Sequence, residues 1–223
     1  MKLQVLARQR NPELKFAYLT QVANLRSLLG HNLKKLGESV VVIDETSMDD
    51  SNFRRNFGRA PAGVRAQKRE MLVGNRRFNT FAALTVKGFL AVHVSEDNGT
   101  KELYELWMNA QVIPFLSHFG VDPTNLSVVH LDNARIHESE VVDAAVQAKG
   151  ALMLRNAPYH FEHSPIEKAF HEVKDWLRRR GHYVNNKTLT LSQCEVYIHE
   201  AFSSVSAQNA KQYFRDCGLY PAY

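Results

Sequence analysis

The sequence predicts an α/β fold, a mixed five-stranded sheet flanked by helices. Residues 40–43 and 126–131 are short, largely apolar runs rich in Val, Ile and Leu, typical of strands buried on both faces of a sheet. Residues 78–85 and 89–94 predict two strands joined by a tight turn, and 152–154 predicts a short fifth strand. Three strands followed by helix, strand, helix, strand and helix is the order of an α/β domain.

Helical patterns surround these strands and suggest three regions. We expect an N-terminal helical segment at 1–37, a core at 38–182 and C-terminal helices at 183–223. Within the core, a helix that follows residues 97–100 should turn Leu106 and Trp107 toward the sheet.

The composition is that of a globular protein and excludes some other classes. The 223 residues are 44% hydrophobic and 23% charged, which allows one substantial core. No apolar run approaches the roughly 20 residues of a membrane span, and the N-terminus lacks the apolar segment of a signal peptide. Cys194 and Cys217 are expected to be free thiols.

Residues 46–77 are predicted to form a basic, irregular insertion between two strands. They hold eight arginines and lysines against three acidic residues, a net charge of +5 that equals the net charge of the whole chain. Because long irregular insertions in compact domains are often functional, we interpret this loop as a surface for DNA or another partner, with a solvated loop as the alternative. The candidate DNA contacts in it are Arg54, Arg55, Lys68 and Arg69.

Three acidic residues stand at the ends of predicted elements. Asp44 and Asp132 each end a strand, and Glu167 lies in the first turn of a helix whose start is predicted at Ser164-Pro165. Carboxylates beside buried strands are costly unless they are paired or bind a cation. If the three converge, they form a site for hard divalent cations such as Mg²⁺ or Mn²⁺.

At these residues the chain resembles a known family. The shared features are an Asp ending the first strand, the segment Asp-Asn-Ala-Arg-Ile-His at 132–137, and 34 residues between Asp132 and the Glu167 of a Pro-Ile-Glu helix start. This combination is similar to that of the mariner-type and related bacterial insertion-sequence transposases, which carry a ribonuclease-H-like DDE catalytic domain. The resemblance covers residues 38–182.

The resemblance implies a DDE endonuclease, the catalytic domain of a transposase that cleaves DNA at transposon ends and joins the 3′-hydroxyl to target DNA. Asp44, Asp132 and Glu167 would hold two Mg²⁺ or Mn²⁺ ions, roughly 4 Å apart, that clamp the attacking and leaving oxygens. The implied partners are transposon-end and target DNA and a second copy of the chain in a homodimer, with no membrane. The implied location is the nucleus in a eukaryote, or the cytoplasm at the nucleoid in a bacterium.

Further candidates lie near the three acids. His137 would either approach a metal-bound phosphate or orient its loop, and Asn133 belongs to the same motif. Lys168, Lys174 and Arg178 lie on or near the Glu167 helix, where they would contact phosphate or form a solvated face.

The chain departs from the family pattern in three ways. A loop of the type Tyr-Ser-Pro-Asp is here Tyr-His-Phe-Glu-His at 159–163, and Ser164 replaces an asparagine. The Trp-x-Pro element of the insertion is Arg-Ala-Pro at 59–61. Only 38 residues precede the first strand, too few for the helix-turn-helix region of complete transposases, so we expect an isolated catalytic domain.

Two alternatives remain open, and a third is set aside. Ser164 and Glu167 fit a capping box, in which Glu167 bonds back to the Ser164 backbone N–H and holds no metal. A domesticated transposase domain would bind DNA or protein without nuclease activity. A zinc site at His160, His163 and His171 is not expected, because no cysteine is nearby and the setting is a loop.

Overall fold

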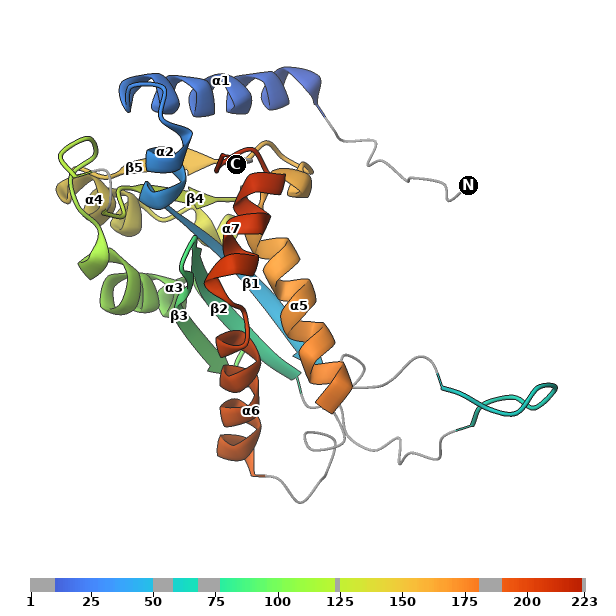
Figure 1. The fold of residues 1–223 in the computed structure, drawn as a ribbon. Coiled ribbons are helices and arrows are strands. Elements are labelled where there is room, and N and C mark those ends of the chain that lie inside the picture. The colour runs from blue at the N-terminus through green and yellow to red at the C-terminus, as the bar shows by residue number, and fades with distance from the viewer. Residues whose placement is uncertain (1–10, 50–57, 68–76, 123–124, 181–189, 222–223) are drawn as a thin grey trace.

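A ten-residue strand, β1 (Val40–Asp49), lies at the centre of a five-stranded sheet with helices on both faces (Figure 1). The structure, a computed structural model, describes residues 11–49, 58–67, 77–122, 125–180 and 190–221. The other strands are β2 (Arg77–Thr85), β3 (Gly88–Ser95), β4 (Val128–Leu131) and β5 (Leu152–Arg155). The α-helices are α1 (Pro12–Leu28), α2 (Leu33–Ser39), α3 (Lys101–Trp107), α4 (Glu140–Ala148), α5 (Pro165–Arg180), α6 (Leu191–Ser203) and α7 (Ala207–Asp216). Short helical turns are η1 (Met108–Val112), η2 (Ile113–Phe115), η3 (Arg135–His137) and η4 (Phe161–His163).

The sheet is mixed, as predicted. Its strand order is β3-β2-β1-β4-β5. β1 pairs antiparallel with β2 on one side and parallel with β4 on the other. β2 forms an antiparallel hairpin with β3. The pairing of β4 with β5 is also parallel.

The side chains of β1 alternate between two apolar cores. Val40 and Val42 belong to a core that α5, α6 and α7 complete, while Val41 and Ile43 belong to a core with α3, η1 and α4. Successive side chains of a strand point to opposite faces, so a sheet that is covered twice needs apolar residues at both. The continuous apolar run at 40–43 follows from this double burial.

β1 is longer than the sequence suggested. It pairs with β2 as far as Asp49 and Arg77, so residues 46–49 of the predicted basic insertion are strand. Of the remainder, residues 58–67 are exposed and contain neither helix nor strand. The four candidate DNA contacts of the insertion, Arg54, Arg55, Lys68 and Arg69, lie outside the described residues.

The helix after residue 100 turns a different face inward from the one predicted. Trp107 is buried as expected, but Leu106 is 67% exposed, and Tyr104 and Met108 take the inward positions instead. These three buried positions follow the i, i+3, i+4 spacing of one α-helical face. The prediction for Leu106 was wrong because apolar residues lie on more than one side of this helix, and the sequence alone does not show which side faces the sheet.

The C-terminal helices share a core with α5. Phe202 of α6 and Phe214 of α7 are buried in the same cluster as Phe170 of α5. Both cysteines are free thiols, as expected. Across the described residues, the helices are too short or too polar to reach across a lipid bilayer. The boundaries drawn at 37 and 182 stay predictions.

The close approach of the C-terminal segment to α2 gives a test of this packing. A Cβ at Gly37 would lie 2.5 Å from Cδ2 of Tyr220 and 2.6 Å from the carbonyl oxygen of Leu219. Gly37→Ala should therefore lower stability by about 1 to 3 kcal/mol through overpacking, although helix propensity alone would favour it by about 1 kcal/mol. Chemical denaturation measures the sign, and a stabilised variant would contradict the docking of Tyr220 on α2.

Candidate active site

Asp44 and Asp132 lie side by side on the two central parallel strands. Val42 pairs with His130, and continuing this register by two residues places Asp44 level with Asp132. Because side chains alternate along a strand, both carboxylates lie on the face of Val42, which α5 covers. Asp44 lies in the middle of β1, so the prediction that it ends this strand was wrong. It follows the last residue paired with β4 by two positions.

Glu167 reaches the same region from the first turn of α5, which crosses this face of the sheet (Figure 1). Pro165 is the first helical residue, as predicted. The backbone N–H of Ser164 donates to the carbonyl oxygen of Phe161 at 2.9 Å. That N–H is the donor a capping box would use, so the capping-box interpretation of Glu167 does not describe this helix start.

The three carboxylates act on one another electrostatically. Burial raises the pKa of Asp44, and the charges of Asp132 and Glu167 raise it further, to about 8. Burial raises the pKa of Glu167 as well; Lys174 opposes this effect and Asp132 adds to it. Burial and negatively charged neighbours favour the protonated form of a carboxyl group at neutral pH, and a bound cation favours the ionised form.

Asp132 is held by its own loop. Its Oδ1 accepts the backbone N–H of Ala134 at 2.8 Å and Nδ1–H of His137 at 2.7 Å. Burial raises the pKa of Asp132, but these two hydrogen bonds outweigh burial and bring it below its ordinary value.

His137 links Asp132 to a fourth acid that the sequence analysis missed. The imidazole is fully buried, and its Nε2 lies 3.1 Å from Oε2 of Glu45, an ion pair rather than a well-aligned hydrogen bond. Burial lowers the pKa of His137, but the contacts with Asp132 and Glu45 outweigh this effect and raise it to about 9. The raised pKa favours the imidazolium form of His137, whose Nδ1–H orients Asp132. Nothing in the sequence marks Glu45 beyond its position next to Asp44.

Asn133 has a structural contact. Its Nδ2 donates to the carbonyl oxygen of Asn156 at 2.5 Å, which ties the loop after β4 to the loop after β5. Asn156 is buried, and its own Nδ2 donates to the carbonyl of His160 at 3.0 Å. The two asparagines thus fix the chain that leads into α5.

The basic candidates on α5 point in different directions. Lys174 lies two turns beyond Glu167 on the same helix face; burial lowers its pKa, which Glu167 and Asp49 partly restore. Lys168 instead forms an ion pair with Asp216 of α7 at 2.6 Å, and Arg178 pairs with Asp175 of its own helix.

A groove of about 1020 Å³ runs beside α5 and is lined by acidic, basic and apolar side chains, Glu167 and Lys168 among them.

The sequence analysis did not expect a zinc site at His160, His163 and His171, but the structure places His160 and His163 close together. Among the described residues, the group of three or more possible metal-binding side chains whose ligand atoms all lie within 4.8 Å of one another is His160, Glu162 and His163. His171 lies elsewhere on α5 and pairs with Asp175. By the same measure, the ligand atoms of Asp44, Asp132 and Glu167 are less tightly gathered.

The sequence profile of the DDE superfamily endonucleases matches residues 39–190. The chain belongs to this family. No curated protein matches it.

Solved structures agree with the fold. The Mos1 transposase paired-end complex with left transposon end aligns with a TM-score of 0.65 and 11% identity, over 98% of this chain and 63% of that chain. The catalytic domain of Mos1 mariner transposase aligns with a TM-score of 0.61 and 11% identity, over 98% of this chain and 93% of that one. The ribonuclease-H-like fold is thereby confirmed. This chain spans 63% of the Mos1 chain in the DNA complex.

The raised pKa of Asp44 predicts how stability depends on pH without metal. The folded state keeps a proton that the unfolded chain releases near pH 4, so folding stability should fall as pH rises from about 4 to about 8. Asp44→Asn should remove this loss and raise the melting temperature at pH 8 by several degrees, at about 2–4 °C per kcal/mol. Melting curves in EDTA at pH 5, 7 and 8.5 measure it.

The exposed Asp97 provides the control for this experiment. Asp97→Asn should leave the pH profile of the melting temperature unchanged. If Asp44→Asn melted no higher than the parent at pH 8, burial and the neighbouring carboxylates would not be raising the pKa of Asp44 in solution.

Proposed function

We propose that this chain is the catalytic domain of a DDE transposase, which cleaves DNA at transposon ends and joins the 3′-hydroxyl to target DNA. The observation that carries the proposal is the convergence of Asp44, Asp132 and Glu167 on one face of the sheet, each within electrostatic reach of another. Membership of the DDE superfamily endonucleases and a fold shared with Mos1 transposase support the reaction class.

The donor set fits Mg²⁺ or Mn²⁺. Three carboxylates offer only oxygen ligands, which hard divalent cations prefer. Burial and the charges of Asp132 and Glu167 raise the pKa of Asp44, and a bound cation would offset both effects. The Mos1 catalytic domain has been solved with raltegravir and Mg, and with raltegravir and Mn. We propose two such ions here; when bound, they would neutralise charge on the reacting phosphate and lower the pKa of the attacking water or hydroxyl.

The chain's own residues prepare this site. His137 and the N–H of Ala134 occupy Oδ1 of Asp132, so Oδ2 is the oxygen we assign to a cation. Glu45 supports the far side of His137 and keeps it charged. Lys174 lies near Glu167 and is the candidate of α5 best placed to meet phosphate beside it.

DNA is the proposed substrate and partner, with a homodimer as the proposed assembly. The basic residues of the insertion and Lys174 would supply contacts to phosphate, which give affinity without sequence preference. The Mos1 transposase has been solved as a paired-end complex with a transposon end. A retained ability to bind DNA without cleavage would instead favour the domesticated binding domain.

Replacement of Glu167 tests the nuclease. Glu167→Gln removes the charge that would hold a cation while it keeps the size of the side chain, so Mg²⁺- or Mn²⁺-dependent nicking of supercoiled plasmid should fall by about 100-fold or more. Mn²⁺ should also raise the melting temperature of the parent more than that of the variant.

The control is Glu140→Gln, a matched change in the first turn of α4 at an exposed position. It should nick like the parent. Equal nicking by Glu167→Gln and the parent would remove Glu167 from the ligand set, and a parent that never nicks but binds DNA would select the binding-domain alternative.

The basic insertion predicts a salt-dependent affinity for DNA. Changing Arg54, Arg55, Lys68 and Arg69 together to Ala should flatten the slope of log affinity against log salt, because each lost phosphate contact reduces the slope by about 0.9. Fluorescence anisotropy with duplexes of unrelated sequence at several salt concentrations measures it.

The matched control removes four exposed lysines elsewhere in the chain, with the same change in net charge. These are Lys34, Lys35, Lys101 and Lys149. Their loss should change the slope much less. An equal change in both quadruple variants would mean that the insertion is not the DNA-binding surface.

A further inference from the structure

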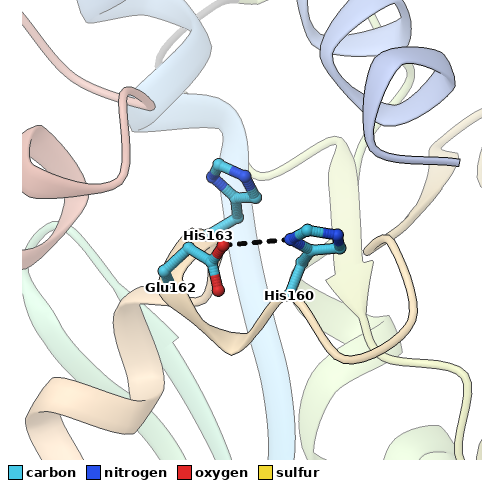
Figure 2. Close-up of side chains that lie close together, drawn as sticks. All are labelled: His160, Glu162 and His163. Carbon is cyan, nitrogen blue, oxygen red and sulfur yellow. Dashed lines mark hydrogen bonds and ion pairs between the residues drawn. The ribbon is translucent and has the colours of Figure 1, made fainter. Parts of the chain in front are cut away.

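The turn that leads into α5 brings two imidazoles and a carboxylate together (Figure 2). His160 precedes η4, and Glu162 and His163 lie within it. Side chains three residues apart eclipse one another in a 3₁₀ turn, and the rings of His160 and His163 accordingly stack with centroids 6.0 Å apart. One potential ligand atom from each of the three residues lies within 4.8 Å of the others.

This group is built into the fold rather than spread over a surface. His160 is 4% exposed, and its Nδ1 lies 2.9 Å from Oε1 of Glu162. Its Nε2 is also buried and has no hydrogen-bond partner among the described residues. One of the two ring nitrogens of His160 therefore makes no hydrogen bond in this part of the chain. The Asn156 side chain holds the carbonyl of His160.

Elements distant in sequence close around the three residues. Tyr18 of α1 lies with its ring 5.4 Å from that of His163, and its hydroxyl lies 3.2 Å from Nε2 of His130 in β4. The thiol of Cys217 donates to the backbone carbonyl of Glu162 at 3.3 Å. Both grounds for not expecting a metal here therefore fail in the folded chain: the loop is an ordered turn, and a cysteine is close.

We propose that His160, Glu162 and His163 bind a Zn²⁺ ion or a similar borderline transition metal. Two imidazoles and one carboxylate match the nitrogen and oxygen donors that Zn²⁺ accepts, with water at the fourth position, whereas Mg²⁺ prefers oxygen alone. Tetrahedral ligands at bonds of about 2.0–2.1 Å stand about 3.3 Å apart. To admit the ion, the 2.9 Å contact between Nδ1 of His160 and Oε1 of Glu162 would open by a few tenths of an ångström, and any pair of ligand atoms near the 4.8 Å limit would close toward this separation.

The ion would tie together the turn that immediately precedes α5. Glu162 and His163 belong to η4, and Ser164 connects η4 to the first residue of α5. A metal on the turn would therefore hold the entry of that helix in place and stabilise the fold by its binding free energy. The proposal rests on these three residues alone and does not require the nuclease function.

Calorimetric titration of the full chain with Zn²⁺ in the presence of excess Mg²⁺ tests the site. We expect one ion per chain. His160→Ala and His163→Ala should each weaken binding at least as much as the roughly 10- to 100-fold that loss of an outer contact costs a metal site. Asp44→Asn should keep the ion, because it alters only the three-carboxylate site.

The control is His171→Ala, which removes an exposed histidine of α5 outside the group. Binding should be unchanged. Three results would overturn the proposal: no Zn²⁺ bound by the parent at micromolar concentration, loss of the ion in Asp44→Asn but not in His160→Ala, or an equal loss in His171→Ala.

X-ray absorption fine structure of the Zn²⁺-bound parent needs no variant and so does not depend on the folding of His160→Ala. It should show nitrogen and oxygen neighbours at about 2.0–2.1 Å with imidazole scattering. A sulfur shell at about 2.3 Å would assign the ion to Cys217 and contradict the ligand set.

Discussion

The parallel pairing of β1 with β4 is the constraint on which the candidate active site depends. It aligns Val42 with His130, and the chain then continues by two residues on each strand to an aspartate. A shift of one residue in this register would move one carboxylate to the opposite face of the sheet. The apolar residues on both faces fix the register, because each face is buried under its own set of helices.

The ionised carboxylates of this site interact unfavourably with one another in the folded chain. Asp44, Asp132 and Glu167 raise one another's energy when ionised, which is typical of functional sites. Asp132 is compensated by the buried side chain of His137 and a backbone N–H, Asp44 by the backbone N–H of Glu45, and Glu167 by the charge of Lys174. The two buried cores on either side of the sheet hold these three carboxylates in place despite the cost.

The segment between β5 and α5 joins this site to the rest of the molecule. Asn133 and Asn156 connect the loop of Asp132 to this segment. Tyr18 from α1 and Cys217 from the C-terminal region close on the same turn. The entry of the helix that carries Glu167 is therefore held by parts of the chain far apart in sequence.

The mixed five-stranded sheet, the succession of strands and helices along the chain and the three candidate acids could be predicted from the sequence, since apolar periodicity, helix-start residues and the 34-residue spacing are local or linear signals. The spatial order of the strands could not. The sequence did not determine where β1 ends or which face of α3 points inward, because strand pairing and competing helical stripes decide these. Nor could it give Glu45 as the partner of His137, the Lys168–Asp216 pair or the closure of Tyr18 and Cys217 on the histidine turn. These contacts join residues that lie 48 to 145 positions apart in the sequence. Only the tertiary structure decided them, because side chains distant in sequence meet only once both cores are packed.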